Sequence, residues 1–151
     1  MLSQLKAQLE FEEGRKLKAY TCTQGHKSVG IGHNLDVKPA FNGQRIPDII
    51  SEQMCDLIFD RDINDVIIQL NVNWPYNTNL DKVRRDAVLN MCFQLGVIGV
   101  MKFKLMLNAL ERSDWVAAKA HALDSTWAIQ THARAKRVAE QLLTGQYYTL
   151  K

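Results

Sequence analysis

A long helical pattern over residues 51–72 constrains the fold of this chain more than any other feature of the sequence. Ser51 is suited to cap the first turn of a helix, and the Asn73-Trp74-Pro75 segment ends the pattern. Between these points apolar residues recur at the spacings that line one face of a helix. They are Met54, Leu57, Ile58, Val66, Ile67 and Leu70. We expect this helix to join two lobes.

The region before this helix predicts one helix followed by a small sheet. Leucines at helical spacing and a glycine stop predict a first helix that ends near Gly14. Residues 17–35 contain two β-prone runs on either side of a turn at residues 23–25, which predicts an antiparallel hairpin. Residues 36–50, which contain two prolines, are expected to form an irregular connection.

The region after residue 78 alternates helical patterns with turns. Ser113-Asp114 is suited to open a short helix, and the last helical pattern covers residues 133–143 and ends before Gly145. Two further apolar faces precede these helices. The first is formed by Val83, Ala87, Val88, Met91, Cys92 and Leu95, and the second by Phe103, Met106, Leu107 and Leu110.

These patterns predict an α+β fold, with a small N-terminal antiparallel sheet lobe joined by the long helix to a mainly helical C-terminal lobe. We expect one domain over residues 1–151, with the sheet lobe at about 13–50, the linking helix at about 51–72 and the helical lobe at about 78–151. The first helix is expected to pack on the helical lobe. With 46% apolar and 23% charged residues, the chain can bury a core, which excludes disordered and fibrous classes.

The cysteines and the N-terminal segment bear on where such a protein works. Cys22, Cys55 and Cys92 cannot all pair, and none lies in a Cys-x-x-Cys spacing, so we expect a reduced site of synthesis and no disulfide scaffold. The first ten residues interrupt their leucines with polar residues, unlike a signal peptide. No run approaches the roughly 20 apolar residues that span a bilayer. Another component must then open any membrane that the protein has to pass.

Charge is unevenly distributed along the chain. Residues 84–151 carry 10 Lys and Arg against 5 Asp and Glu, whereas residues 1–83 carry 9 against 11. A basic half of this kind attracts a polyanion, either nucleic acid or an anionic cell envelope. A solvated helical surface of ordinary composition accounts for the same charges equally well.

Three side chains are candidates for chemistry. Glu13 lies at the end of the first helix, where the chain turns toward the hairpin, and Cys22 and Ser28 lie on the hairpin itself. Because hairpin strands bring sequence-distant side chains to one edge, the three can converge on a substrate atom. The alternative is that Glu13 is an ordinary solvated residue at a helix end.

Two runs around these residues resemble the signature of the phage-type lysozymes, glycoside hydrolase family 24. They are EEGRKLKAY at residues 12–20 and SVGIGH at residues 28–33. The family pattern is a Glu, eight residues, an Asp or Cys, five residues and a Thr, and Glu13, Cys22 and Ser28 reproduce this spacing. Further similarity follows in DKVRR at 81–85, NMCFQLG at 90–96, Trp127, Gln130-Thr131, RAKR at 134–137 and Thr144-Gly145. The resemblance covers most of the chain, is weak over residues 36–80 and implies a lysozyme-like fold.

The resemblance implies hydrolysis of the β-1,4 bond between N-acetylmuramic acid and N-acetylglucosamine in peptidoglycan. Glu13 would then be the general acid that protonates the leaving oxygen. Cys22 occupies a position often held by Asp, and Ser28 replaces Thr but keeps the hydroxyl that holds water. A thiolate is also a strong nucleophile, so both inversion through a positioned water and retention through a thioglycoside stay open. The resemblance favours inversion.

The resemblance also implies residues that bind substrate or support the acid. Gly32, Asn34, Phe93 and Gln94 are the expected substrate-binding residues, in a cleft between the sheet and the helical lobe. Met106 and His121 lie at positions that contact glycan in relatives, although the residue types differ. The expected supporting residues are Arg134, which would orient the carboxylate of Glu13, and an ion pair of His33 with Asp62.

Rival interpretations remain open at this stage. Cys22 with His26 or His33 could form a Cys-His amidase that cuts peptide crosslinks of the same wall. The same residues could form a zinc site, although their spacings resemble no known zinc-ligand pattern. A nucleic-acid binder would use Arg84, Arg85, Arg134, Lys136 and Arg137.

The favoured interpretation is a monomeric muramidase that acts on bacterial peptidoglycan in host cell lysis and phage release, without nucleic acid, metal or cofactor. It would be made in the host cytoplasm and reach the periplasmic wall after a holin permeabilises the membrane.

Overall fold

The computed structural model describes residues 3–150 and divides them into two units. Residues 6–65 form one, the sheet unit, and residues 3–5 and 66–150 form the other, the helical unit. Helices α1 (Ser3–Glu13) and α2 (Glu52–Asn73) each contribute residues to both units. The predicted α+β class is confirmed, since the described residues are mostly helical and also form a small antiparallel sheet.

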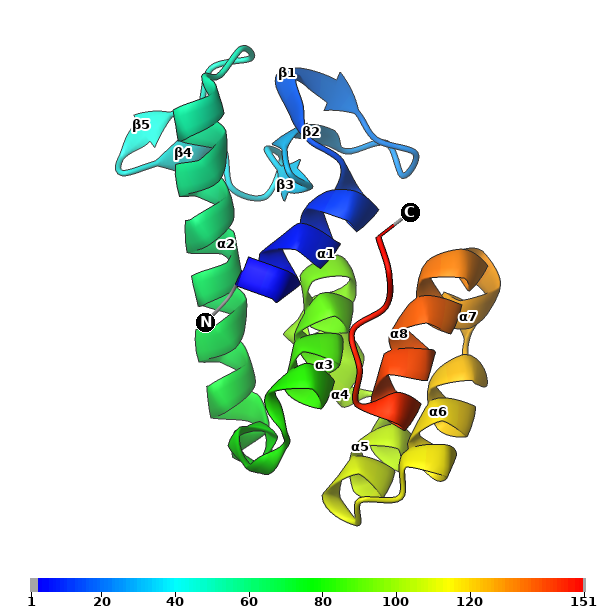
Figure 1. Cartoon of the computed structure of the whole chain (residues 1–151). Coiled ribbons are helices and arrows are strands. Elements are labelled where there is room, and N and C mark those ends of the chain that lie inside the picture. Colours follow the sequence, from blue (N-terminus) through cyan, green and yellow to red (C-terminus); the bar gives the residue numbers. More distant parts are fainter. Residues whose placement is uncertain (1–2, 151) are drawn as a thin grey trace. The chain divides into compact units, whose positions relative to one another are not determined.

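Three short strands form the main sheet of the sheet unit (Figure 1). They are β1 (Lys16–Thr21), β2 (Lys27–Gly30) and β3 (His33–Asn34), in the order β1-β2-β3 with both pairings antiparallel. In the turn between β1 and β2, the N–H of Gly25 donates to the carbonyl of Cys22 at 2.9 Å. The hairpin predicted for residues 17–35 is therefore confirmed.

Residues 36–50 contain more order than the irregular connection that the sequence indicated. β4 (Ala40–Phe41) and β5 (Gln44–Arg45) form a second antiparallel pair. Asn42 and Gly43 join them with φ of 51° and 77°. Two consecutive residues with positive φ are what a tight two-residue hairpin turn requires, and Asn-Gly is its most favourable sequence. The local signal was present, and the prediction of an irregular connection was wrong.

Helix α2 begins where Ser51 was expected to cap it, because the Ser51 hydroxyl accepts the N–H of Met54 at 3.0 Å. Its apolar face differs in detail from the predicted stripe. Leu57 is 46% exposed, so its assignment to the buried stripe was wrong. Ile58 and Leu70 are buried as predicted, and Met54, Val66 and Ile67 are half-buried. The rest of the buried face consists of Cys55, Phe59 and Ile63, which the predicted stripe did not include.

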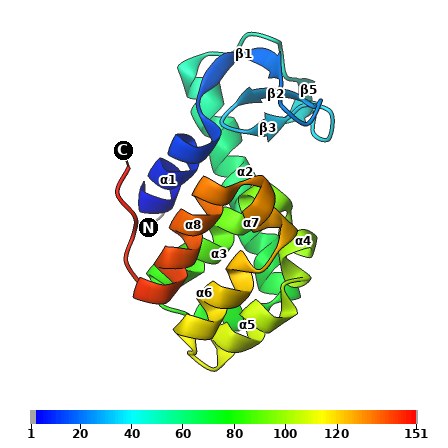
Figure 2. The ribbon, with the colours of Figure 1, turned by 90° about the vertical axis from the view of Figure 1, so that its right-hand side faces the viewer.

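The helical unit continues from α2 with a short 3-10 helix and six α-helices. They are η1 (Pro75–Asn79), α3 (Lys82–Leu95), α4 (Val97–Met101), α5 (Lys104–Glu111), α6 (Trp115–Leu123), α7 (Thr126–Gln130) and α8 (His132–Thr144). Helix α6 packs against α5 and α8, and α8 also packs against α3 and α7 (Figure 2). Within the described residues, no helix is long and apolar enough to cross a membrane.

Local signals account for several of these helix ends. The carboxylates of Asp81 and Asp114 accept the N–H groups of Arg84 and Ala117, each at 3.1 Å, which caps α3 and α6. Gly145 follows α8 with φ of 68°, the left-handed conformation that ends helices. The start predicted at Ser113-Asp114 and the stop predicted at Gly145 are confirmed, whereas the cap at Asp81 was not among the predictions.

Candidate active site

Glu13 is the last residue of α1, and a glycine fixes where that helix ends. Gly14 has φ of 77°, and its N–H donates to the carbonyl of Glu10 at 2.8 Å. A positive φ does not fit an α-helix, and it is unfavourable for residue types other than glycine. The chain therefore leaves the helix directly after Glu13, whose side chain is half-buried.

The carboxyl group of Glu13 lies against the backbone of Gly32, in the turn between β2 and β3. A Cβ atom at residue 32 would be 2.7 Å from Oε1 of Glu13 and 3.0 Å from both Cδ and Cγ. Gly32 also has φ of 64°. Only glycine meets both conditions without strain, so the identity of residue 32 determines where the carboxyl group of Glu13 can lie.

Ser28 lies at the centre of the same sheet. It is a register partner of Tyr20 on β1 and of Asn34 on β3, and only 5% of it is exposed. Cys22 follows β1 at the start of the turn, where its N–H donates to the carbonyl of His26 at 2.8 Å. The sheet unit thus carries Glu13, Cys22 and Ser28 on the elements that the sequence indicated.

The thiol of Cys22 is electrostatically different from the other two cysteines. Hydrogen bonding from the backbone of Gln24 and His26 lowers the pKa of Cys22. Burial instead raises the pKa of Cys55, and it raises that of Cys92 to about 12. Among the three free cysteines, Cys22 is the one whose pKa is lowered, so it forms a thiolate more readily than Cys55 or Cys92.

Tyr20 belongs to this group of residues, and sequence reasoning missed it. The pKa of Tyr20 is raised because burial disfavours the phenolate, and the negative charges of Glu13 and Cys22 add to the effect. Its phenol therefore stays protonated beside the carboxylate and the thiol. The signal was available, since a turn centred on residue 24 puts residue 20 opposite Ser28.

His33 forms the predicted pair with Asp62, and both of its ring nitrogens face oxygen atoms. Nδ1 of His33 is 2.6 Å from Oδ2 of Asp62, and Nε2 is 2.7 Å from the carbonyl oxygen of Lys38. A carboxylate and a carbonyl both accept hydrogen bonds, so this arrangement favours the imidazolium, in which both ring nitrogens donate. Consistent with this, the pKa of His33 is raised: burial lowers it, but the hydrogen bond and the charge of Asp62 outweigh burial. His33 is a structural cation that ties β3 to α2.

Asn34, a predicted substrate-binding residue, has a structural role as well. Its Oδ1 accepts the N–H groups of Asp36 and Val37 at 2.9 and 3.2 Å. The side chain thus closes the turn that follows β3.

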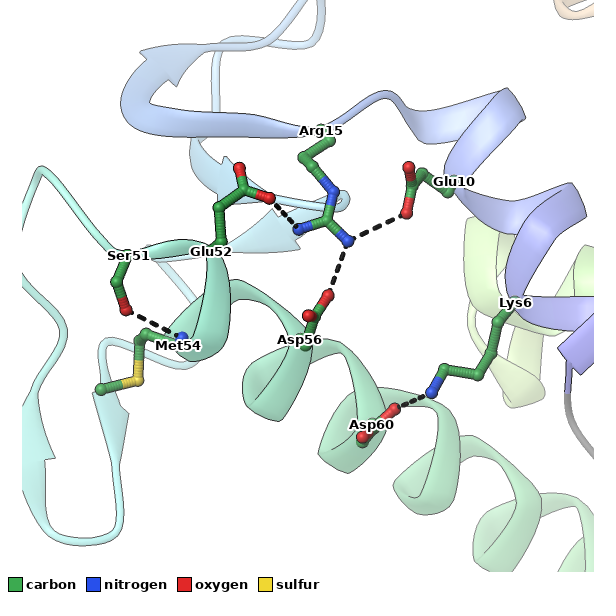
Figure 3. A network of polar contacts seen from close by, with 8 residues as sticks. All are labelled: Lys6, Glu10, Arg15, Ser51, Glu52, Met54, Asp56 and Asp60. Carbon is green, nitrogen blue, oxygen red and sulfur yellow. Dashed lines mark hydrogen bonds and ion pairs between the residues drawn. The ribbon is translucent and has the colours of Figure 1, made fainter.

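An ion-pair network holds the end of α1 on the first turns of α2 (Figure 3). The guanidinium of Arg15 contacts Glu10, Glu52 and Asp56 at 3.0, 3.1 and 2.6 Å. One turn further along, Lys6 pairs with Asp60. These contacts hold α1 and α2 together near the end of α1, where Glu13 lies.

The helical unit carries the remaining predicted residues. Gln94 accepts the indole N–H of Trp127 at 2.8 Å, and Phe93 beside it is half-buried. Arg134 on α8 is 8% exposed, and its guanidinium donates to Oδ1 of Asn90 at 2.9 and 3.1 Å. The roles expected for these residues in binding or catalysis remain predictions.

A pocket of about 520 Å³ lies within the helical unit. Its lining combines apolar side chains with a few charged ones and includes Lys102, Phe103, Met106, His121, Asp124 and Trp127. Met106 and His121 are thereby in one pocket. Within residues 3–150, no group of three or more His, Cys, Asp or Glu side chains is arranged to hold a metal ion.

Comparison with known proteins gives a consistent family. The profile of the phage lysozyme family matches residues 10–144. The chain is 31% and 34% identical to probable T4-type lysozymes 1 and 2 of Dictyostelium discoideum, in each case over 96% of this chain and 96% of the relative. It is also 33% identical, over 91% of its length, to 27% of the pre-baseplate central spike protein Gp5 of Enterobacteria phage T4. The chain therefore belongs to the phage lysozyme family, which makes it a lysozyme-type glycoside hydrolase.

Proposed function

We propose that this protein is a muramidase that hydrolyses the β-1,4 bond between N-acetylmuramic acid and N-acetylglucosamine in bacterial peptidoglycan, with Glu13 as general acid. One observation carries the assignment of the acid: the carboxyl group of Glu13 lies against Gly32, in a turn of the sheet unit that also contains Cys22 and Ser28. Family membership supports the reaction class.

In the proposed reaction, Glu13 gives its proton to the oxygen that leaves as the glycosidic C–O bond breaks. A water molecule held by the Ser28 hydroxyl attacks the anomeric carbon, and its proton passes to the thiolate of Cys22. The lowered pKa of Cys22 supports this role, because a thiolate supplies the negative charge that an Asp would supply at the same position. This route inverts the anomeric configuration.

Retention is the alternative stereochemical outcome. Here the Cys22 thiolate itself attacks the anomeric carbon, Glu13 protonates the leaving oxygen, and water later hydrolyses the thioglycoside. A glycosyl adduct on Cys22, trapped and detected by mass spectrometry, would decide for retention.

For substrate binding we propose Gly32, Asn34, Phe93 and Gln94, as the resemblance implies. Gly32 suits this role because a residue without a side chain lets a sugar approach the backbone. The pocket in the helical unit is a further candidate binding site for part of the substrate. A separate proposal is that Arg134 has a supporting role in the reaction.

The geometry argues against parts of both rival functions. Both ring nitrogens of His33 are engaged, by Asp62 and by the Lys38 carbonyl, so His33 is not available to pair with Cys22. Of the cations that a nucleic-acid binder would use, Arg84 donates to the carbonyls of Leu142 and Leu143 and stacks on the ring of Trp115 at 3.9 Å, and Arg134 is buried.

The biological role is a separate proposal. We propose host cell lysis and phage release by a monomeric enzyme that reaches the periplasmic wall after a holin opens the membrane. Similarity to proteins of both Dictyostelium and a phage supports the chemistry more strongly than this role. Lysis timing in an infected culture, with the holin gene deleted, tests it.

The decisive experiment compares Glu13→Gln with Glu12→Gln, a neighbouring carboxylate on the same helix. Release of reducing sugar ends from purified peptidoglycan is measured for both, with free amines measured in parallel. Loss of a general acid typically costs about 10²- to 10⁴-fold in rate, which is the loss expected for Glu13→Gln only. Retained activity in Glu13→Gln, or release of amines instead of reducing ends, would contradict the proposal.

A further inference from the structure

The buried guanidinium of Arg134 donates to the side-chain amide of Asn90. Nε and one terminal nitrogen of Arg134 donate to Oδ1 of Asn90 at 3.1 and 2.9 Å, and Asn90 is fully buried. A guanidinium only donates hydrogen bonds, so the oxygen of the Asn90 amide must face it. The position of Arg134 on α8 therefore depends on how the Asn90 side chain on α3 is oriented.

The other end of that amide is held by the C-terminal segment. Nδ2 of Asn90 donates to the phenolic oxygen of Tyr148 at 3.1 Å. Without this phenol, a buried N–H of Asn90 would lose the acceptor that the structure gives it. Asn90 would then turn toward other acceptors, and the oxygen that Arg134 uses would move with it.

Tyr148 belongs to a C-terminal segment that Tyr147 also attaches to α3. Residues 146–150 follow the left-handed Gly145 and form no helix or strand. The preceding residue, Tyr147, donates to the buried carboxylate of Asp86 at 2.5 Å and accepts from Lys82 at 3.0 Å. The two adjacent tyrosines thus anchor one segment to α3 through separate partners.

We propose that Tyr148 is a positioning residue, which holds the guanidinium of Arg134 in its working orientation by way of Asn90. The proposal rests on the supporting role in the reaction proposed above for Arg134. It makes the C-terminal segment part of the functional architecture, although no residue of it was among the sequence candidates.

The test compares Tyr148→Phe with Tyr147→Phe as the matched control. Each substitution removes one phenolic oxygen from the same segment, but only the first touches Asn90. We expect Tyr148→Phe to lower kcat about tenfold, with KM changed by less than twofold, and to shift the NMR signal of the Arg134 Nε–H group. Tyr147→Phe should lower thermal stability while leaving kcat and the Arg134 signal near their original values.

A double-mutant cycle with Asn90→Ala separates positioning from general destabilisation. If Tyr148 acts through Asn90, the loss in kcat from Tyr148→Phe disappears once Asn90→Ala is present. Additive losses, equal losses in the two tyrosine variants, or an unchanged Arg134 signal in Tyr148→Phe would each overturn the proposal.

Results that would overturn the proposed function differ from those that would overturn the role of Tyr148. Peptidoglycan left uncut by the unmodified enzyme, or cut normally by Glu13→Gln, would overturn the muramidase assignment or its acid. Normal cutting by Tyr148→Phe alone would overturn only the role of Tyr148.

Discussion

Replacing Gly32 by Ala should reduce activity far more than it reduces stability. The new Cβ would lie 2.7 Å from Oε1 of Glu13, whereas ordinary contact begins at 3.4 Å, so the carboxyl group must move by about 0.7 Å. Because the clashing atoms belong to the flexible end of Glu13, the side chain can swing aside at little cost to the fold. A misplacement of 1 Å in a reacting group can cost about 100-fold in rate. We therefore expect kcat to fall roughly 10- to 100-fold.

The backbone strain of this variant can be matched in a control. Gly30 has φ of 67°, close to the 64° of Gly32, but a Cβ at residue 30 would make only ordinary contacts with Cys55 and Ile50, at 3.4 and 3.7 Å. An Ala in the left-handed region costs about 1–2 kcal/mol at either position. For a chain of this size the two variants should each lose about 2–8 °C in Tm.

The assay is the release of reducing ends from purified peptidoglycan, measured beside thermal unfolding. Gly30→Ala should keep kcat within about twofold, since its strain does not reach Glu13. Equal losses of activity in the two variants would refute the reasoning, because strain alone would then explain both. Full activity in Gly32→Ala would show that the position of the Glu13 carboxyl group does not limit the reaction.

Two further predictions concern ionisation. Iodoacetamide at pH 8 should modify Cys22 first, because the pKa of Cys22 is lowered while burial raises the pKa of Cys55 and Cys92. The modified enzyme should be inactive. Peptide mass spectrometry gives the order of modification, and earlier modification of Cys55 or Cys92 would contradict the prediction. Asp62→Asn should lower the free energy of unfolding by about 1–3 kcal/mol at pH 6. Since the folded-state pKa of His33 is raised, its stabilisation is full below the ordinary value of about 6.5 and is lost as pH rises through the folded value. Denaturant unfolding from pH 6 to 9 should therefore show the difference between Asp62→Asn and the unmodified protein shrinking, and a constant or growing difference would count against the imidazolium.

Much of the candidate site could be predicted, because its residues have local signals or match a family pattern. Glu13 is delivered by a helix that a glycine stops, and Ser28 lies on a hairpin that a turn signal predicts. The pairing of His33 with Asp62 came from resemblance. Tyr20 was missed because the turn indicates only which residue lies opposite it in the hairpin. Nothing in a single sequence indicates that Tyr20 is partly buried near Glu13 and Cys22.

The sequence by itself determined the helices, their caps and the first hairpin, because hydrophobic period, capping side chains and positive-φ glycines act over a few residues. Only the tertiary structure decided that Gly32 borders the Glu13 carboxyl group, that both ring nitrogens of His33 face oxygen atoms, and that Tyr148 reaches Arg134 through Asn90. These properties depend on atoms from segments up to 58 residues apart, as between Asn90 and Tyr148. Their chemistry is set by burial and by which donors meet which acceptors, and no local pattern encodes either.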